Sequence, residues 1–199
     1  MEKENAISQY RFDDLLHEKN SEFANFQKEF KKNKICVIRN LIKPEALRLL
    51  QAYFQSLVRF GALKRDDRQC KSRYQAYKDP LANEIQPLFE NFVGKLVGSP
   101  VKSSYNYLAV YLPGAVLKPH KDREQCKYTL DLAINIKSDG ELYLWPLYVG
   151  KKKVTLEAGD AVLFMGCNLK HYRKKLPNGN VITNLFLHYV DAKFMGSLN

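Results

Sequence analysis

Apolar positions near the start of the chain recur at helical spacing among lysine, glutamate and glutamine. This pattern predicts one amphipathic helix or two short ones, because residues three and four apart share one face of a helix. A short strand over residues 35–39 should follow. The residues that carry the helical spacing are Phe12, Leu15, Leu16, Phe23, Phe26 and Phe30.

A second helix is predicted over residues 44–60. Its first residue, Pro44, is tolerated in a first helical turn, and Gly61 stands just past its end. Residues 62–80 are polar and crowded with charge, which predicts a surface loop. A third helix should cover residues 81–96.

The pattern changes from Ser103 onward, where short segments rich in Tyr, Val, Leu and Ile are separated by Gly and Pro. Such a run of short strands with turn signals is typical of a sandwich or barrel. We therefore expect a mainly β fold with α-helices, in which N-terminal helices pack on a double-stranded β-helix, or jelly roll. The predicted strands fall within residues 105–112, 113–120, 128–136, 141–149, 152–158, 160–166 and 180–190.

No repeat and no Gly/Ser- or Pro-rich linker divides the chain. Its 199 residues suit one domain, since independent domains typically have about 100–200 residues. We expect residues 1–199 to form that domain, with 1–100 as a mostly helical lead-in and 101–190 as the jelly-roll core. The composition, 45 % hydrophobic and 27 % charged, is that of a globular protein and not of a disordered one.

The sequence predicts neither a membrane-spanning helix nor a signal segment. No apolar run approaches the roughly 20 residues of a membrane-spanning helix, and the charged start has no apolar signal segment. The four cysteines form no Cys-x-x-Cys pair, which favours reduced thiols. The expectation is a cytoplasmic protein without membrane insertion, and its oligomeric state is not readable from the sequence.

The net charge of +11 favours negatively charged partners such as nucleic acid, an anionic membrane surface or a small polyanion. A solvated basic surface explains the same excess equally well.

Two of the four histidines, His120 and His171, lie in the predicted β half, and Asp122 stands two residues after the first. Side chains two apart on a strand point to the same face, so His120 and Asp122 can aim at one interior point that His171 closes from elsewhere. Two imidazoles and one carboxylate on one face of an octahedral ion leave three positions open, as in non-haem iron oxygenases.

A His-x-Asp pair alone arises often by chance and is usually an ordinary polar pair. The surrounding residues favour the metal interpretation. A Tyr-x-Pro-Gly-Ala-x-Leu-x-x-His-x-Asp run extends from Tyr111 to Asp122, and Gly159-Asp160 precedes an apolar strand after which His171 follows.

With these motifs, residues 101–190 resemble the iron(II)- and 2-oxoglutarate-dependent oxygenase superfamily. The stretch YLPGAVLKPHKD is similar to the first core strands of AlkB-type and prolyl-hydroxylase-type enzymes, and GDAVLFMGCNLKHYR is similar to the segment with their distal histidine. The resemblance implies that iron(II) binds His120, Asp122 and His171. It also implies that Tyr111 hydrogen-bonds the 2-oxoglutarate co-substrate.

The sequence departs from the family at one position. Many members place Arg or Lys about ten residues after the distal histidine to pair with the far carboxylate of 2-oxoglutarate, and here that residue is Val181. In an AlkB-type alignment, Ile182 and His188 stand where co-substrate arginines would. His188 beside Asn184 is a candidate contact or an ordinary strand histidine.

Another cation must then pair with that carboxylate. Arg173 is the first choice, because a guanidinium binds a carboxylate through two parallel hydrogen bonds. Arg123 and Lys127 are further candidates, although Arg123 also makes a plausible surface pair with Asp122. The missing cation leaves open an unusual co-substrate pose or a different co-substrate.

The resemblance implies an Fe(II)/2-oxoglutarate-dependent dioxygenase that hydroxylates a C–H bond of a peptide side chain or small metabolite. The intact Asp122 agrees with hydroxylation or demethylation, since related halogenases have a small residue there. Three alternatives stay open: an AlkB-like nucleic-acid demethylase, a non-catalytic basic jelly-roll binding module, and a cupin-like metal enzyme without 2-oxoglutarate. The basic residues near the ligands favour an anionic substrate, and they are Lys118, Lys121, Arg123, Lys127, Lys170, Arg173, Lys174 and Lys175.

Overall fold

The computed structural model describes residues 15–198 and consists of two antiparallel β-sheets with helices on the outer face of the larger one. The larger sheet has the strand order β1-β9-β6-β11-β4-β3-β2, and the smaller sheet the order β5-β10-β7-β8. This arrangement confirms the expected fold class of a mainly β protein with packing helices.

The strands of the larger sheet are β1 (Ile35–Ile38), β2 (Lys64–Arg65), β3 (Arg73–Tyr77), β4 (Val101–Tyr111), β6 (Tyr128–Ser138), β9 (Ala161–Phe164) and β11 (Asn180–Asp191). The strands of the smaller sheet are β5 (Leu117–His120), β7 (Leu147–Val149), β8 (Lys152–Val154) and β10 (His171–Arg173). The helices are α2 (Phe23–Asn33), α3 (Pro44–Arg59), α4 (Pro80–Ile85) and α5 (Glu90–Val97), with short 3-10 helices at Gln86–Phe89 and Glu124–Cys126.

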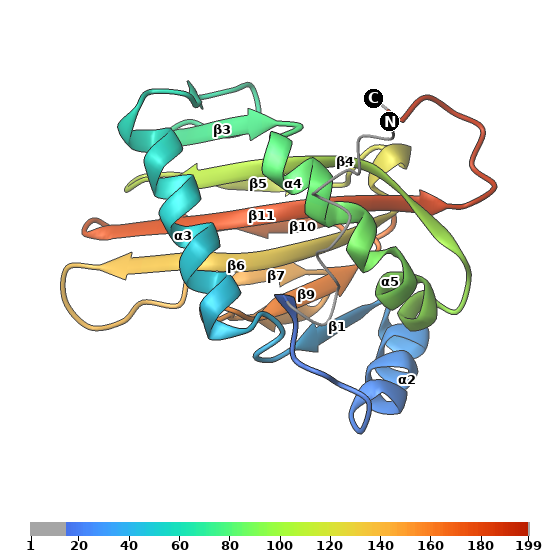
Figure 1. Cartoon of the computed structure of the whole chain (residues 1–199). Coiled ribbons are helices and arrows are strands. Elements are labelled where there is room, and N and C mark those ends of the chain that lie inside the picture. Colours follow the sequence, from blue (N-terminus) through green and yellow to red (C-terminus); the bar gives the residue numbers. More distant parts are fainter. Residues whose placement is uncertain (1–14, 199) are drawn as a thin grey trace, which may run out of the picture.

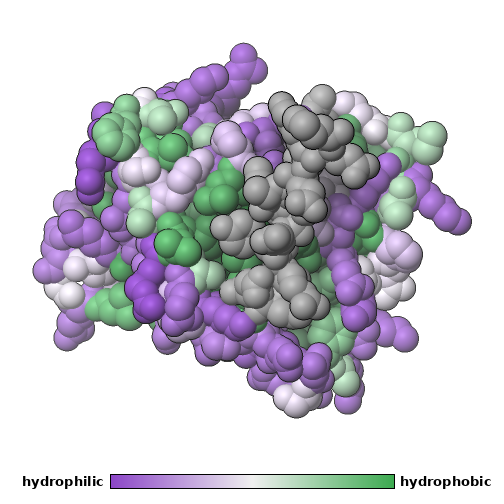
Figure 2. Space-filling view, viewed as in Figure 1, coloured by the Kyte–Doolittle hydropathy of each residue, from purple (hydrophilic) through white to green (hydrophobic). Residues whose placement is uncertain are grey.

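Helix α3 lies across one part of the larger sheet, α4 and α5 lie across another part, and α2 lies next to α5 and β1, while β5, β7 and β10 lie behind that sheet (Figure 1). The predicted start at Pro44 is confirmed, because this proline opens α3. Leu50 and Phe54 on the buried face of α3 join the core that the helices form with the larger sheet. Figure 2 shows this face of the molecule, on which hydrophilic residues predominate and apolar residues gather in separate patches among them.

The space between the two sheets holds two smaller apolar clusters and the inward-facing polar groups. One cluster includes Leu147, Val149 and Phe164, and the other includes Tyr111, Trp145 and Ile182. Val181, the residue before Ile182 on β11, packs on the side of the larger sheet that faces the helices. A side chain at position 181 therefore faces away from the space between the sheets, and position 182 faces into it.

The prediction of a surface loop over 62–80 is wrong. Residues 64–65 and 73–77 form β2 and β3, which extend the larger sheet beside β4. The prediction failed because it took charged residues to be exposed, whereas the charged Arg73 is only 2 % exposed. Its guanidinium is paired with Asp67, and this pairing makes its burial tolerable.

The predicted helix over 81–96 is also divided. Its residues form α4, a 3-10 turn and α5, and Pro87 lies in the turn where an α-helix would need its missing N–H. In the predicted segment 141–149 only Leu147–Val149 is a strand. Near the start, α2 begins at Phe23 and Leu16 bridges to Ile42, whereas Phe12 lies outside the described residues.

None of the helices within residues 15–198 combines the length and the apolar character that crossing a bilayer demands.

Candidate metal centre

His120 and His171 meet through the pairing of two short strands. His120 ends β5, His171 begins β10, and the two residues are direct partners in the antiparallel register. Their ring centroids lie 4.2 Å apart. Asp122 lies just beyond the end of β5, where its backbone N–H donates to the carbonyl of Gly166 at 3.0 Å. Strand alternation therefore does not place Asp122, because the chain has already left the strand.

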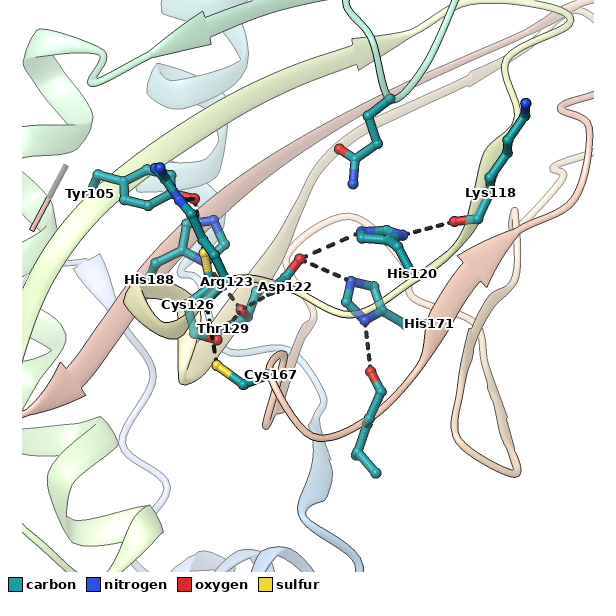
Figure 3. A network of polar contacts seen from close by, with 12 residues as sticks. Tyr105, Lys118, His120, Asp122, Arg123, Cys126, Thr129, Cys167, His171 and His188 are labelled. Atoms are coloured by element: carbon teal, nitrogen blue, oxygen red, sulfur yellow. Dashed lines mark hydrogen bonds and ion pairs between the residues drawn. The ribbon is translucent and has the colours of Figure 1, made fainter.

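The three side chains point to one another (Figure 3). Oδ1 of Asp122 lies 3.5 Å from Nε2 of His120 and 3.4 Å from Nε2 of His171. The three ligand atoms all lie within 4.8 Å of one another, as the ligands of a single metal ion must. The predicted convergence of His120, Asp122 and His171 is thus present in the structure.

The outer ring nitrogens show which atoms face this centre. Nδ1 of His120 lies 2.8 Å from the carbonyl oxygen of Lys118, and Nδ1 of His171 lies 2.9 Å from that of Leu169. A carbonyl oxygen only accepts, so each Nδ1 carries its hydrogen. In the neutral rings both Nε2 lone pairs then face the Asp122 carboxylate, and a divalent cation between them fits this all-acceptor set.

The protein holds Asp122 as an anion. Burial alone raises the pKa of this carboxyl, but hydrogen bonds to His120 and His171 outweigh burial and hold the pKa far below its usual range. The Thr129 hydroxyl donates to the outer oxygen Oδ2 at 3.4 Å. The hydrogen bonds from His120 and His171 use a proton on Nε2 of each ring, and a metal ion takes the place of these protons when it binds, so the ionised carboxylate is already the form that metal binding requires.

His188 lies behind this carboxylate. Its Nδ1 is 3.0 Å from the Thr129 hydroxyl, so a chain of hydrogen bonds runs from His188 through Thr129 to Asp122. Burial lowers the pKa of His188 to about 4, which makes the ring neutral near pH 7. His188 therefore supplies no positive charge to a bound carboxylate.

A cavity of about 290 Å³ opens at the three ligands. At one end, Tyr111 packs edge-to-face on Trp145 with ring centroids 5.0 Å apart, and Arg73 and Arg173 flank it. The predicted site residues that line the cavity are His120, Asp122, His171, Tyr111, Arg123, Arg173 and His188.

Arg173 lies inside the cavity wall, as a co-substrate contact requires, but it already has partners. It donates to the Trp145 carbonyl at 2.6 Å and to Oδ2 of the fully buried Asp131 at 3.1 Å. Asn184, also among the predicted contacts, donates to the other Asp131 oxygen at 2.6 Å and does not line the cavity. Lys127 forms an ion pair with Asp191 and lies outside the cavity lining.

Arg73 is the site residue that sequence reasoning missed. It is the register partner of Tyr111 on β3, and its Nη1 donates to the Tyr111 hydroxyl at 3.3 Å. Its guanidinium lies 5.1 Å from the Tyr107 ring centroid and is paired with Asp67. In the sequence, Arg73, Gln75 and Tyr77 alternate with Tyr74 and Ala76, and such a pattern of period two indicates a strand. In a strand, Arg73 can point inward although its neighbours in sequence point outward.

No protein-family model matches the chain, and no curated protein matches it. Solved structures do share its fold. The α-ketoglutarate-dependent epimerase SnoN of nogalamycin biosynthesis matches with a TM-score of 0.71 at 11 % identity, over 87 % of this chain and 82 % of that one. A Pseudomonas putida prolyl-4-hydroxylase matches with a TM-score of 0.65 at 13 % identity, over 83 % and 98 %.

HygX from Streptomyces hygroscopicus, solved with nickel, 2-oxoglutarate and hygromycin B bound, matches with a TM-score of 0.65 at 13 % identity, over 85 % of this chain and 88 % of that one. At such identities the similarity shows the fold alone. It confirms the jelly-roll architecture expected from the sequence, and the resemblance to these oxygenases holds at the level of the fold.

Proposed function

We propose that the chain is an iron(II)- and 2-oxoglutarate-dependent dioxygenase that hydroxylates a C–H bond of a small metabolite or a peptide side chain. The observation that carries this proposal is the convergence of His120, Asp122 and His171 at the opening of a cavity in a jelly roll that such oxygenases share. Two imidazoles and one carboxylate leave open positions for co-substrate and O₂ on the iron.

The other end of the cavity suits the far carboxylate of 2-oxoglutarate. Tyr111 presents a hydroxyl there, and the buried Nε atoms of Arg73 and Arg173 have no hydrogen-bond partner in the described part of the chain. Neither guanidinium is therefore saturated by protein acceptors. These three side chains offer hydrogen-bond donors to an anionic group, and we assign the far carboxylate to them.

Arg73 accounts for the missing cation on β11. Arg73, Tyr111 and Ile182 are register neighbours on β3, β4 and β11, so they form one row across the larger sheet. The family cation expected near Val181 and Ile182 is replaced by an arginine two strands away in the same row. Tyr111 lies between the two positions and contacts both.

When bound, iron(II) and 2-oxoglutarate would activate O₂ as the oxidant, with one oxygen atom entering the succinate formed by decarboxylation of 2-oxoglutarate and the other entering a C–H bond of the substrate. The chain's own residues prepare the site for that chemistry. The Lys118 and Leu169 carbonyls fix the two histidine rings, and Thr129 fixes the Asp122 carboxylate. The apolar wall excludes water and consists of Leu117, Leu147, Phe164 and Phe186.

Stepwise calorimetry under anaerobic conditions tests the proposal. Wild type should bind Fe(II) or Mn(II), and only the metal-loaded protein should then bind 2-oxoglutarate tightly. His120→Ala should lose the metal, whereas Arg73→Gln should keep the metal and bind 2-oxoglutarate about tenfold or more weakly, because a charge-assisted contact is lost.

Two outcomes would contradict the proposal. Absence of metal binding by wild type favours the basic binding module, and metal binding without 2-oxoglutarate binding favours a cupin-like enzyme with another co-substrate. Arg173→Gln, compared with Arg73→Gln, shows how the two arginines share the carboxylate.

A further inference from the structure

Arg123 stands immediately after the metal ligand Asp122 and lines the same cavity. Its guanidinium lies 4.6 Å from the Tyr105 ring centroid. Nε donates to the Tyr105 hydroxyl at 3.3 Å, and Nη2 donates to the Tyr77 hydroxyl at 3.4 Å. The Cys167 thiol donates to the backbone carbonyl of Arg123 at 3.1 Å. These contacts hold the exposed side chain of Arg123 against Tyr105 and Tyr77, beside the candidate metal centre.

Arg123 differs from the other two arginines of the cavity in its charge balance. Arg73 is paired with Asp67, and Arg173 with Asp131. Within residues 15–198, no carboxylate forms an ion pair with Arg123, whose contacts are phenol hydroxyls and an aromatic face. A fixed arginine with spare donors and no counter-ion is a ready partner for an oxyanion.

Arg123 also lies apart from the end assigned to the co-substrate. Its guanidinium contacts Tyr105, and Tyr105 precedes Tyr111 by six residues on the same strand. At about 3.4 Å per residue, the Cα atoms of Tyr105 and Tyr111 are roughly 20 Å apart. In Figure 3, Arg123 and Tyr105 lie on one side of Asp122, and His120 and His171 on the other. A single five-carbon dicarboxylate bound at Tyr111 does not extend to Arg123.

We infer that the primary substrate carries a carboxylate or phosphate group that pairs with Arg123, and that this contact places the reacting C–H bond at the metal. This inference rests on the proposed function for the reaction itself. The aromatic residues at this end of the cavity supply contacts for an apolar substrate body, and they are Tyr77, Tyr105 and Phe186.

The test uses protein loaded with Mn(II), which supports no turnover, and saturated with 2-oxoglutarate. Three probes are titrated by calorimetry: 3-phenylpropanoate, phenyl phosphate and the neutral 3-phenylpropanamide. The first two distinguish a carboxylate from a phosphate preference. The variants are Arg123→Gln and, as the matched loss of one exposed positive charge, Lys121→Gln, which lies outside the cavity lining.

At least one anionic probe should bind wild type about tenfold or more tightly than the amide does, and Arg123→Gln should abolish that difference while Lys121→Gln preserves it. The inference is overturned if no anionic probe binds wild type, if Arg123→Gln binds the probes as wild type does, or if 2-oxoglutarate displaces them. Repeating the titration with Mn(II) alone separates the two claims. A protein that fails to bind 2-oxoglutarate but binds the anion through Arg123 contradicts only the proposed function.

Discussion

Gly166 is a residue through which the metal centre can be perturbed without changing any ligand. A Cβ at this position would lie 2.8 Å from the Cys126 carbonyl oxygen and 3.0 Å from the Thr129 hydroxyl. It would lie closer still to Oδ2 of Asp122, the outer oxygen of the predicted metal ligand. Gly166 is not among the glycines with positive φ, so an alanine there meets a steric and not a conformational barrier.

The size of the effect follows from these distances. An ordinary contact between carbon and oxygen is about 3.3 Å, so the 2.8 Å between the new Cβ and the Cys126 carbonyl oxygen is already about 0.5 Å too short. Oδ2 of Asp122 would lie closer to that Cβ than the carbonyl oxygen does, so the carboxylate must move by more than about 0.5 Å. Metal–ligand distances tolerate deviations of only about 0.2 Å. We therefore expect Gly166→Ala to weaken metal binding by about 10–100-fold, as changes around metal ligands commonly do.

The assay is calorimetric titration of Mn(II) into Gly166→Ala and into Gly140→Ala, with near-UV circular dichroism to establish that both variants are folded. Gly140 is the matched control, because a Cβ there meets nothing within 4 Å. Gly140→Ala should bind Mn(II) as wild type does. If the folded Gly166→Ala variant also binds Mn(II) with wild-type affinity, the assigned position of Asp122 at the metal is wrong.

Three further predictions concern stability and are measured by urea unfolding. Arg173→Met leaves the fully buried Asp131 without its counter-ion and should lower the free energy of unfolding by about 3–5 kcal/mol; an unchanged value would contradict the buried pair. The pKa of His188 is lowered to about 4, against about 6.5 when unfolded, so the unfolded state binds the proton first and stability should fall by roughly 3 kcal/mol from pH 7 to pH 4. His188→Gln should lose that part of the pH dependence, and the same fall in stability from pH 7 to pH 4 in wild type and His188→Gln would refute this role of His188. Phe54→Ala, 1 % exposed, should lose about 3–5 kcal/mol, whereas Phe60→Ala, 81 % exposed, should change stability little.

The sequence was sufficient to predict the fold class and the convergence of three candidate metal ligands, His120, Asp122 and His171. Short apolar segments after residue 100 predicted a sandwich or barrel, and the His-x-Asp pair with a distant histidine predicted that these three side chains meet. The pairing itself was not readable, because the contact between His120 and His171 depends on the register of β5 with β10, two short strands far apart in the chain. The place of Asp122 depends on the Gly166 carbonyl, which no local pattern reveals.

Arg73 shows where local reasoning failed. Its segment contains many charges, and charge density usually indicates solvent exposure. The exception arises from tertiary contacts, since the guanidinium of Arg73 is paired with Asp67, donates to the Tyr111 hydroxyl and lies over the Tyr107 ring inside the protein. Arg173, in contrast, was a candidate co-substrate contact from the sequence and does line the cavity, but its pairing with Asp131 across the two sheets could not be predicted from a local pattern.

The most direct test of the central claim is succinate formation. Protein supplied with Fe(II), O₂ and 2-oxoglutarate should produce succinate in wild type and none in His120→Ala, and the yield should rise when a true substrate is present. Iron-loaded wild type that binds 2-oxoglutarate but forms no succinate, with or without candidate anionic substrates, would contradict the assignment of this protein as a 2-oxoglutarate-dependent dioxygenase.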